Sequence, residues 1–162
     1  RHRTLLIWGF KIVFAGLAFV LLIIIIIMLF FRKGFAGLTN KELICENTSP
    51  GYRTKSIIKY KSNKTYEESF DTDKQIGNGP LTSEYTYKTA SSKDLKENSY
   101  KAMKEVQNGD SYLLTLKERK QRQKDGKILT LDKNVEYIVT VKGKNVQIFS
   151  KSRNINKLCK VK

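Results

Sequence analysis

The clearest pattern in the chain is a continuous apolar run near the N-terminus. Sixteen of the twenty residues from Ile12 to Phe31 are Leu, Ile, Val or Phe, and the other four are Ala15, Gly16, Ala18 and Met28. A 20-residue helix is about 30 Å long, which matches the hydrocarbon core of a bilayer. The nearest charged residue, Lys11, lies at the boundary of the run, where its side chain can reach the headgroups. The run therefore predicts a transmembrane helix.

The same run is too long for a cleavable signal peptide, whose apolar core has about 7–15 residues, and no small-x-small cleavage pattern follows it. We therefore expect residues 1–33 to form an N-terminal flank and an uncleaved transmembrane signal anchor. Residues 34–51 show little apolar periodicity and contain several Gly, Asn, Ser and Pro residues, so we expect a tether there.

Residues 52–162 show mainly the alternating pattern of β-strands. A plausible hairpin turns at Asn63-Lys64, and the clearest one turns at residues 142–145. Gly and Pro residues predict a loop over residues 74–80. The alternation predicts about seven strands, over residues 52–62, 65–71, 82–89, 112–117, 127–131, 135–141 and 146–150.

One helix is expected between the third and fourth of these strands. Ser91 and Asp94 have the spacing of a capping box, and Asn108-Gly109 is a typical stop. Between them, helical spacing aligns an apolar stripe made of Leu95, Ser99, Ala102, Met103 and Val106. The predicted fold class is one transmembrane helix followed by a small, mainly antiparallel α+β domain with one amphipathic helix.

The domain is strongly basic. The chain after Phe31 holds 28 basic and 15 acidic residues, a charge that attracts anionic surfaces or, in the plainer interpretation, only keeps the domain soluble. The densest basic segment offers a candidate contact for anionic envelope polymer, lipid phosphates or an acidic partner: Lys117, Arg119, Lys120, Arg122 and Lys124. A solvated hairpin tip, with all five side chains exposed, is the alternative. No aromatic residue occurs between Tyr112 and Tyr137, so nucleic-acid binding is not expected.

The two cysteines decide the expected topology, because the charges flanking the apolar run are nearly balanced. Cys45 and Cys159 bracket almost the whole soluble region, which predicts a disulfide and an oxidising compartment. We therefore expect a single-pass plasma-membrane protein with a cytoplasmic N-terminus and an extracytoplasmic domain over residues 52–162. Two free thiols are the alternative, and they would leave open a cytoplasmic domain that binds acidic lipids or nucleic acid.

Catalytic patterns are missing from the sequence. There is no Gly-rich phosphate loop, nucleophile elbow or zinc-type Cys/His spacing, and the single histidine is His2. Ser56 and Lys59 have the spacing of a Ser-x-x-Lys motif, but strand geometry would put them on opposite faces, as it would Glu67 and Glu68. We expect no enzymatic activity, no cofactor and no metal.

The order of features along residues 45–160 resembles the YehR-like small surface lipoproteins of low-GC bacteria. The shared features are an N-terminal membrane signal, Cys45, a Lys/Thr/Tyr-rich hairpin, one helix, further hairpins and the terminal Cys159-Lys160. The resemblance implies a surface location. The chain departs from that group because it lacks a lipid-acceptor cysteine and keeps its anchor, and no site residue is carried over.

Taken together, these patterns predict a membrane-anchored envelope protein whose basic domain binds a partner or an anionic surface. The alternative is a structural accessory subunit of a larger membrane complex. In that case Ala15, Gly16 and Ala18 would allow a close approach by another helix.

Overall fold

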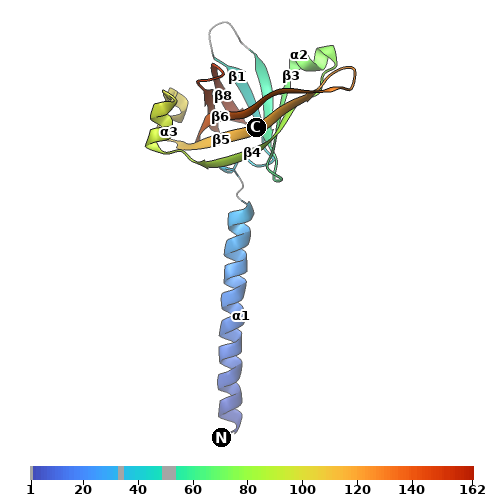
Figure 1. The fold of residues 1–162 in the computed structure, drawn as a ribbon. Coiled ribbons are helices and arrows are strands. Elements are labelled where there is room, and N and C mark those ends of the chain that lie inside the picture. Colours follow the sequence, from blue (N-terminus) through green and yellow to red (C-terminus); the bar gives the residue numbers. More distant parts are fainter. Residues whose placement is uncertain (1, 33–34, 49–53) are drawn as a thin grey trace. The chain divides into compact units, whose positions relative to one another are not determined.

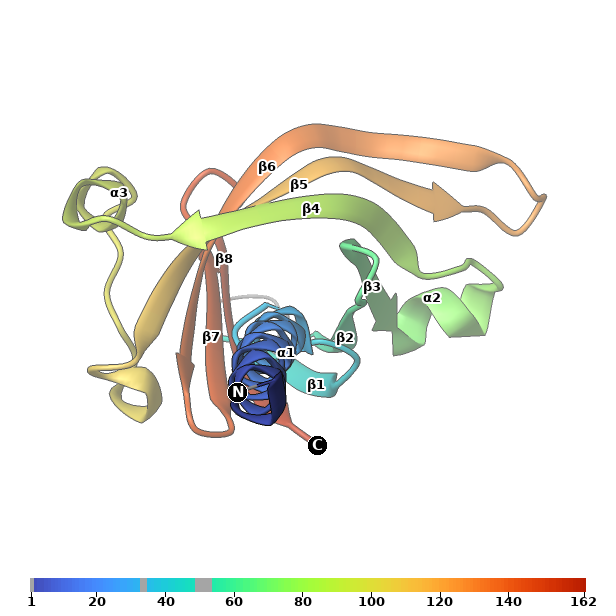
Figure 2. The same ribbon diagram turned by 90° about the horizontal axis from the view of Figure 1, so that it is seen from below.

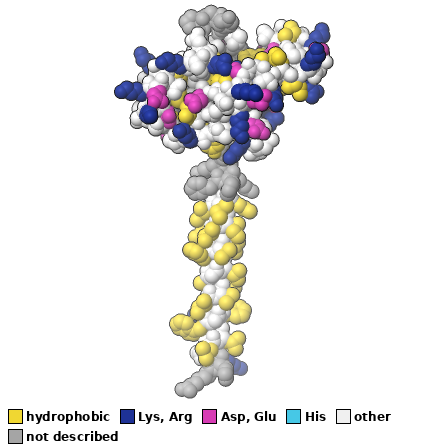
Figure 3. All heavy atoms as spheres, viewed as in Figure 1, with side chains coloured by type: hydrophobic (Ala, Val, Ile, Leu, Met, Phe, Trp, Pro, Cys, Tyr) yellow, Lys and Arg dark blue, Asp and Glu magenta, His cyan; other side chains and the backbone are white. Residues whose placement is uncertain are grey.

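The computed structural model describes residues 2–32, 35–48 and 54–162, and it divides into two units, residues 1–37 and 38–162. The first unit is the helix α1, His2–Arg32. Its segment from Arg3 to Met28 is long and apolar enough to cross a membrane. Hydrophobic side chains cover this helix along its length (Figure 3), and large ones such as Leu5 and Phe14 are about 70% exposed. A helix exposed in this way is compatible with a membrane anchor or a signal sequence.

The second unit is a closed barrel of eight antiparallel strands in sequence order (Figures 1 and 2). Each strand pairs with the next, and the first pairs with the last, as in up-and-down barrels. The strands are β1 Glu42–Asn47, β2 Lys55–Tyr60, β3 Thr65–Phe70, β4 Leu81–Thr89, β5 Asp110–Arg122, β6 Ile128–Lys142, β7 Asn145–Ser150 and β8 Ile155–Val161.

The core lies inside the barrel because alternate residues of each strand point inward. In β2, Ser56, Ile58 and Tyr60 are buried while the residues between them are partly exposed. The ring of Tyr60 packs against the rings of Tyr66 and Tyr85, with centroids 5.7 and 5.4 Å apart. This packing confirms the predicted hairpin at Asn63-Lys64, which brings β2 and β3 together.

The strand connections fall alternately at the two ends of the barrel. The chain enters β1 at one end, where residues 38–40 lie beside β2 and Asn40 N donates to Tyr60 O at 2.7 Å. The β2–β3 turn, the β4–β5 connection over residues 90–109, the β6–β7 turn and the last residues of β8 share this end, which we call the entry end. The opposite end holds the β5–β6 turn, the β7–β8 turn and the short helix α2, Asp71–Ile76.

The β5–β6 hairpin is longer than the rest of the barrel, and its outer part extends to one side together with α2 (Figure 2). The pairing of β6 with β7 covers only Ile138–Lys142, so the earlier half of β6 is an edge of the sheet. The loop after α2 supports the other side of the hairpin. Gly79 N donates to Arg122 O at 2.9 Å, and Lys124 N donates to Asn78 Oδ1 at 3.0 Å.

The prediction of a mainly antiparallel β domain is confirmed, but several of the strands differ from the predicted ones. Residues 42–47 belong to β1, so the tether predicted over residues 34–51 is wrong there, and residues 155–161 form the unexpected β8. The strands predicted over residues 127–131 and 135–141 are one strand, β6. Part of the loop predicted over residues 74–80 is the end of α2. Residues 49–53 lie outside the described part of the chain.

The helix predicted after Ser91 begins where expected but is shorter than predicted. The capping box forms, with Ser91 Oγ accepting from Asp94 N at 3.1 Å, but the helix α3 covers only Ser92–Glu97. Ser99 then takes a left-handed conformation (φ 52°), and a 3-10 turn, Lys104–Val106, follows.

Tertiary hydrogen bonds replace the helix over the following residues. Gln147 on β7 accepts from Met103 N at 2.8 Å and donates to Lys101 O at 3.1 Å. Tyr100 OH reaches the same Gln147 side chain at 3.0 Å. These partners lie on the outer surface of the barrel, so the segment is held extended across it. Of the predicted apolar stripe, only Val106 is fully buried.

Candidate functional site

Arg119, one of the five predicted contact residues, is not available to a ligand. Its Nε lies 2.6 Å from Asp132 Oδ1, and its side chain is only 14% exposed. Burial lowers the pKa of Arg119, but the hydrogen bond to Asp132 and the charges of Tyr137, Asp132 and Tyr66 together outweigh it, so the pKa is raised overall. The same hydrogen bond lowers the pKa of Asp132, which also pairs with Arg153 at 3.2 Å. The predicted exposure of Arg119 is therefore wrong, because Arg119 belongs to a structural ion-pair cluster.

Lys117 and Lys120 line a groove of about 490 Å³ on β3, β4 and β5. Each lysine of this groove has an acidic neighbour. The pairs are Lys117 with Glu84 at 3.5 Å, Lys120 with Glu118 at 3.8 Å, and Lys61 with Glu67 at 2.7 Å. Because the three pairs balance, the groove has little net attraction for an anion. The structure therefore brings Lys117 and Lys120 together, but in a groove whose positive and negative charges balance.

Arg122 and Lys124 lie farther out along the hairpin, and both side chains are exposed. Lys127 lies across the turn and makes only a long, highly exposed ion pair with Asp125, at 3.9 Å. We name the outer part of the hairpin, Gln121–Leu131, the hairpin tip. In the tip three basic residues face one acidic residue, so this part of the predicted segment keeps a positive charge.

The hairpin tip also exposes aliphatic side chains, which the sequence reasoning missed. Ile128, Leu129 and Leu131 are 63%, 49% and 43% exposed. Nearby on α2, Ile76 is 59% exposed. The sequence predicts a strand over residues 127–131, and the structure shows that these residues lie on the part of β6 that β7 does not cover. Exposed aliphatic residues on a sheet edge beside cations are typical of an interaction surface.

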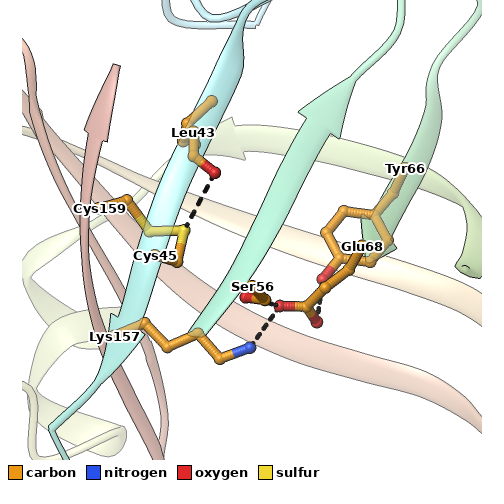
Figure 4. The surroundings of a disulfide bond; sticks show 7 residues. All are labelled: Leu43, Cys45, Ser56, Tyr66, Glu68, Lys157 and Cys159. Atoms are coloured by element: carbon orange, nitrogen blue, oxygen red, sulfur yellow. Dashed lines mark hydrogen bonds and ion pairs between the residues drawn. A yellow bond between two sulfur atoms is a disulfide. The ribbon is translucent and has the colours of Figure 1, made fainter. Parts of the chain in front are cut away.

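A second polar cluster lies inside the barrel, on β2, β3 and β8 (Figure 4). Glu68 accepts hydrogen bonds from Ser56 Oγ and Tyr66 OH, both at 2.7 Å, and forms an ion pair with Lys157 Nζ. The side chains of Glu68 and Lys157 are 2% and 7% exposed. The carboxylate is closed to solvent and its oxygens already accept three hydrogen bonds, so the cluster is suited to structure rather than to chemistry.

The strand geometry confirms two expectations about this region. Ser56 points into the barrel while Lys59 pairs with Glu42 on the outside at 3.2 Å, so they do not form a Ser-x-x-Lys site. Glu67 and Glu68 likewise point to opposite faces. In residues 2–32, 35–48 and 54–162, no group of three or more His, Cys, Asp or Glu side chains could hold a metal ion.

The predicted disulfide is present between Cys45 and Cys159 (Figure 4), with the Cα atoms 4.0 Å apart. The two residues are directly opposite each other on β1 and β8. Cys159 therefore lies within a strand, whereas the sequence placed it after the last one. The bond crosses the seam at which the first and last strands close the barrel.

Alkaline pH should destabilise the barrel through its buried tyrosines. Burial raises the pKa of Tyr60 and of Tyr66 well above the usual value, and the Glu68 charge adds to both shifts. Above pH 10 the unfolded chain releases these protons first, so the free energy of unfolding should fall as pH rises. The slope should approach about 1.4 kcal/mol per pH unit for each tyrosine.

Denaturant titrations between pH 8 and pH 11.5 would measure this slope. Tyr66→Phe should make the slope shallower, whereas Tyr112→Phe, at a half-buried position, should change it less. An identical slope in both variants would contradict the assignment to the barrel interior.

Comparison with known proteins finds no family model, no curated protein and no solved structure that matches this chain.

Proposed function

We propose that this chain is a single-pass, membrane-anchored envelope protein whose basic barrel domain binds a partner without catalysing a reaction. In this proposal α1 is the anchor, its N-terminus is cytoplasmic, and the barrel is extracytoplasmic. The disulfide supports this placement because such bonds persist in oxidising compartments.

The observation that carries the binding role is the chemistry of the hairpin tip. Ile128 and Leu129 are exposed on a sheet edge, and Arg122, Lys124 and Lys127 surround them. An edge strand can add a partner strand through main-chain hydrogen bonds, and aliphatic and charged side chains then select the sequence. The surface fits an extended acidic segment or an anionic envelope polymer.

Removing the positive charge of the hairpin tip should weaken binding to a polyanion. The full chain in neutral-lipid nanodiscs would be titrated with a glycerol-phosphate polymer at low and high salt. The triple variant Arg122→Gln, Lys124→Gln, Lys127→Gln should bind roughly tenfold more weakly, because exposed ion pairs contribute up to about 1 kcal/mol each. It should also lose most of the salt dependence.

The matched control is Lys88→Gln, Lys93→Gln, Lys96→Gln, which removes the same charge from exposed positions outside the tip. Equal weakening in both triple variants would show that only the net charge of the domain matters. Unchanged binding in the tip variant would overturn the role of the tip.

The accessory-subunit alternative differs in what detergent extraction yields. A partner-binding protein should be extracted as a monomer, whereas a structural subunit should co-purify as a stable assembly. Ile128→Ser with Leu129→Ser should release a partner held at the hairpin tip but leave an assembly held through α1 intact.

A further inference from the structure

We propose that the entry end of the barrel docks on the anionic headgroups of the bilayer that α1 crosses. This inference rests on the proposed function only in taking α1 as a membrane span. It assigns a lipid-facing role to a part of the barrel other than the hairpin tip, and it fixes which end of the domain faces the membrane.

The first support is the charge at this end of the barrel. The segments at this end are residues 41–42, 61–64, 90–109, 142–145 and 160–162, and all of them are described by the structure. They contain eleven lysines and four acidic residues, which are Glu42, Asp94, Glu97 and Glu105. Seven of the lysines lie outside the β4–β5 connection: Lys41, Lys61, Lys64, Lys142, Lys144, Lys160 and Lys162.

The pairing of these lysines leaves most of the charge facing solvent. Glu42 is shared by Lys59 and Lys162, at 3.2 and 3.4 Å, and both pairs are open to water. Lys61 forms an ion pair with Glu67 on the outside of the barrel. The other five of these seven lysines are exposed, and one of them, Lys142, donates from Nζ to Gln107 O at 2.9 Å. A surface of this kind attracts anionic lipid, and each lysine near the bilayer strengthens the binding about fivefold.

The strand pairing explains why the lysines gather. The β6–β7 turn lies next to the end of β8, since Val161 N donates to Lys144 O at 2.9 Å. The end of β8 in turn lies next to the start of β1, where Lys162 N donates to Glu42 O at 3.0 Å. Lysines that are up to 121 positions apart in sequence therefore share one rim of the barrel.

The second support is the length of chain between α1 and β1. Only nine residues separate Arg32 from Glu42, and a fully extended chain of that length spans about 30 Å at most. The chain enters the barrel at the basic end, so that end is the part of the barrel tied most closely to the anchor. Attachment keeps its effective concentration at the bilayer high, and even weak lipid contacts would then hold it there.

Docking at the entry end would direct the hairpin tip away from the lipid, because the two lie at opposite ends of the strands β5 and β6. The exposed aliphatic residues of the tip would then be presented to partners beyond the membrane surface. One end of the barrel would bind lipid and the other would bind the partner.

The test uses the full chain reconstituted in vesicles and a tryptophan at each end of the barrel. Trp8 is the only native tryptophan, so both probes are placed in a Trp8→Phe background. Ser62→Trp reports on the exposed β2–β3 turn of the entry end, and Ile128→Trp reports on the hairpin tip. Quenching by a headgroup-attached nitroxide lipid is compared in anionic and in zwitterionic vesicles.

We expect strong quenching of the tryptophan at position 62 in anionic vesicles at low salt, and weak quenching in zwitterionic vesicles or at high salt. The tryptophan at position 128 should be quenched little under all conditions. Adding Lys64→Gln, Lys144→Gln and Lys160→Gln should lower the ratio of docked to undocked barrel on the order of 100-fold. Arg122→Gln, Lys124→Gln and Lys127→Gln, the matched control, should leave the quenching unchanged.

Quenching at position 128 instead of position 62, or quenching independent of lipid charge, would overturn the inference. Failure of the proposed function looks different, because a chain without a membrane span would be released from the vesicles by alkaline carbonate. Retention in the membrane without quenching at position 62 would remove only the docking inference.

Discussion

Lys157→Met is expected to destabilise the barrel domain by about 3–5 kcal/mol, because it leaves the carboxylate of Glu68 buried without its counter-ion. Ser56 and Tyr66 would still donate hydrogen bonds to Glu68, but these two neutral donors do not compensate for the loss of the positive charge of Lys157. The Lys157 ammonium also lies over the Phe70 ring, with Nζ 5.2 Å from the ring centroid, so the substitution removes this cation–π contact while methionine keeps most of the side-chain volume. Chemical denaturation of the purified protein would measure the loss.

Two variants separate the buried charge from other effects. Glu68→Gln combined with Lys157→Met should recover much of the stability, since the neutral amide accepts from one of the two hydroxyls through its oxygen and donates to the other through its NH2 group. Lys162→Met, which breaks an exposed pair with Glu42, should change the free energy of unfolding far less than Lys157→Met. A Lys157→Met variant as stable as Lys162→Met would refute a dominant role for the buried pair.

Reduction of the Cys45–Cys159 bond is expected to lower the free energy of unfolding by about 4–5 kcal/mol. The bond joins residues 114 positions apart, so it removes a large loop entropy from the unfolded chain. It also ties β1 to β8, the one place where the barrel is closed by strands from the two ends of the domain. Urea titrations with and without reductant would measure the change without altering the side-chain volume.

Cys45→Ala with Cys159→Ala should be destabilised at least as strongly and should no longer respond to reductant. Thiol alkylation and mass spectrometry on protein from native membranes complete the test. Two cysteines that are alkylated freely without reductant would contradict the bond and reopen the question of which side of the membrane the domain faces.

The sequence failed where long-range contacts decided the local structure. Residues 99–103 have the apolar spacing of a helix. However, the Gln147 side chain forms hydrogen bonds with the backbone of Met103 and Lys101, and these bonds hold the segment against the barrel. Residues 42–47 carry few signals of a strand by themselves. They become β1 because β2 and β8 supply hydrogen bonds on both sides.

The candidate site was found in part. The basic segment beginning at Lys117 could be recognised from the sequence, because five cations over eight residues are visible without a fold. The sequence could not show which of these cations are structural and which are exposed. The bulge between Arg119 and Lys120 and the pairing with Asp132 turn Arg119 into a structural residue, whereas Arg122 and Lys124 stay exposed.

The sequence by itself determined the long apolar helix, the antiparallel β character and the pairing of its two cysteines. These follow from local hydrophobicity, from period-two alternation and from the small number of thiols, none of which needs distant contacts. Only the tertiary structure decided that eight strands close into a barrel, that Glu68 meets Lys157 inside it, and that scattered lysines share the entry end. Those arrangements depend on which strand pairs with which and in what register, and local sequence patterns do not specify strand pairing over 89 to 114 residues.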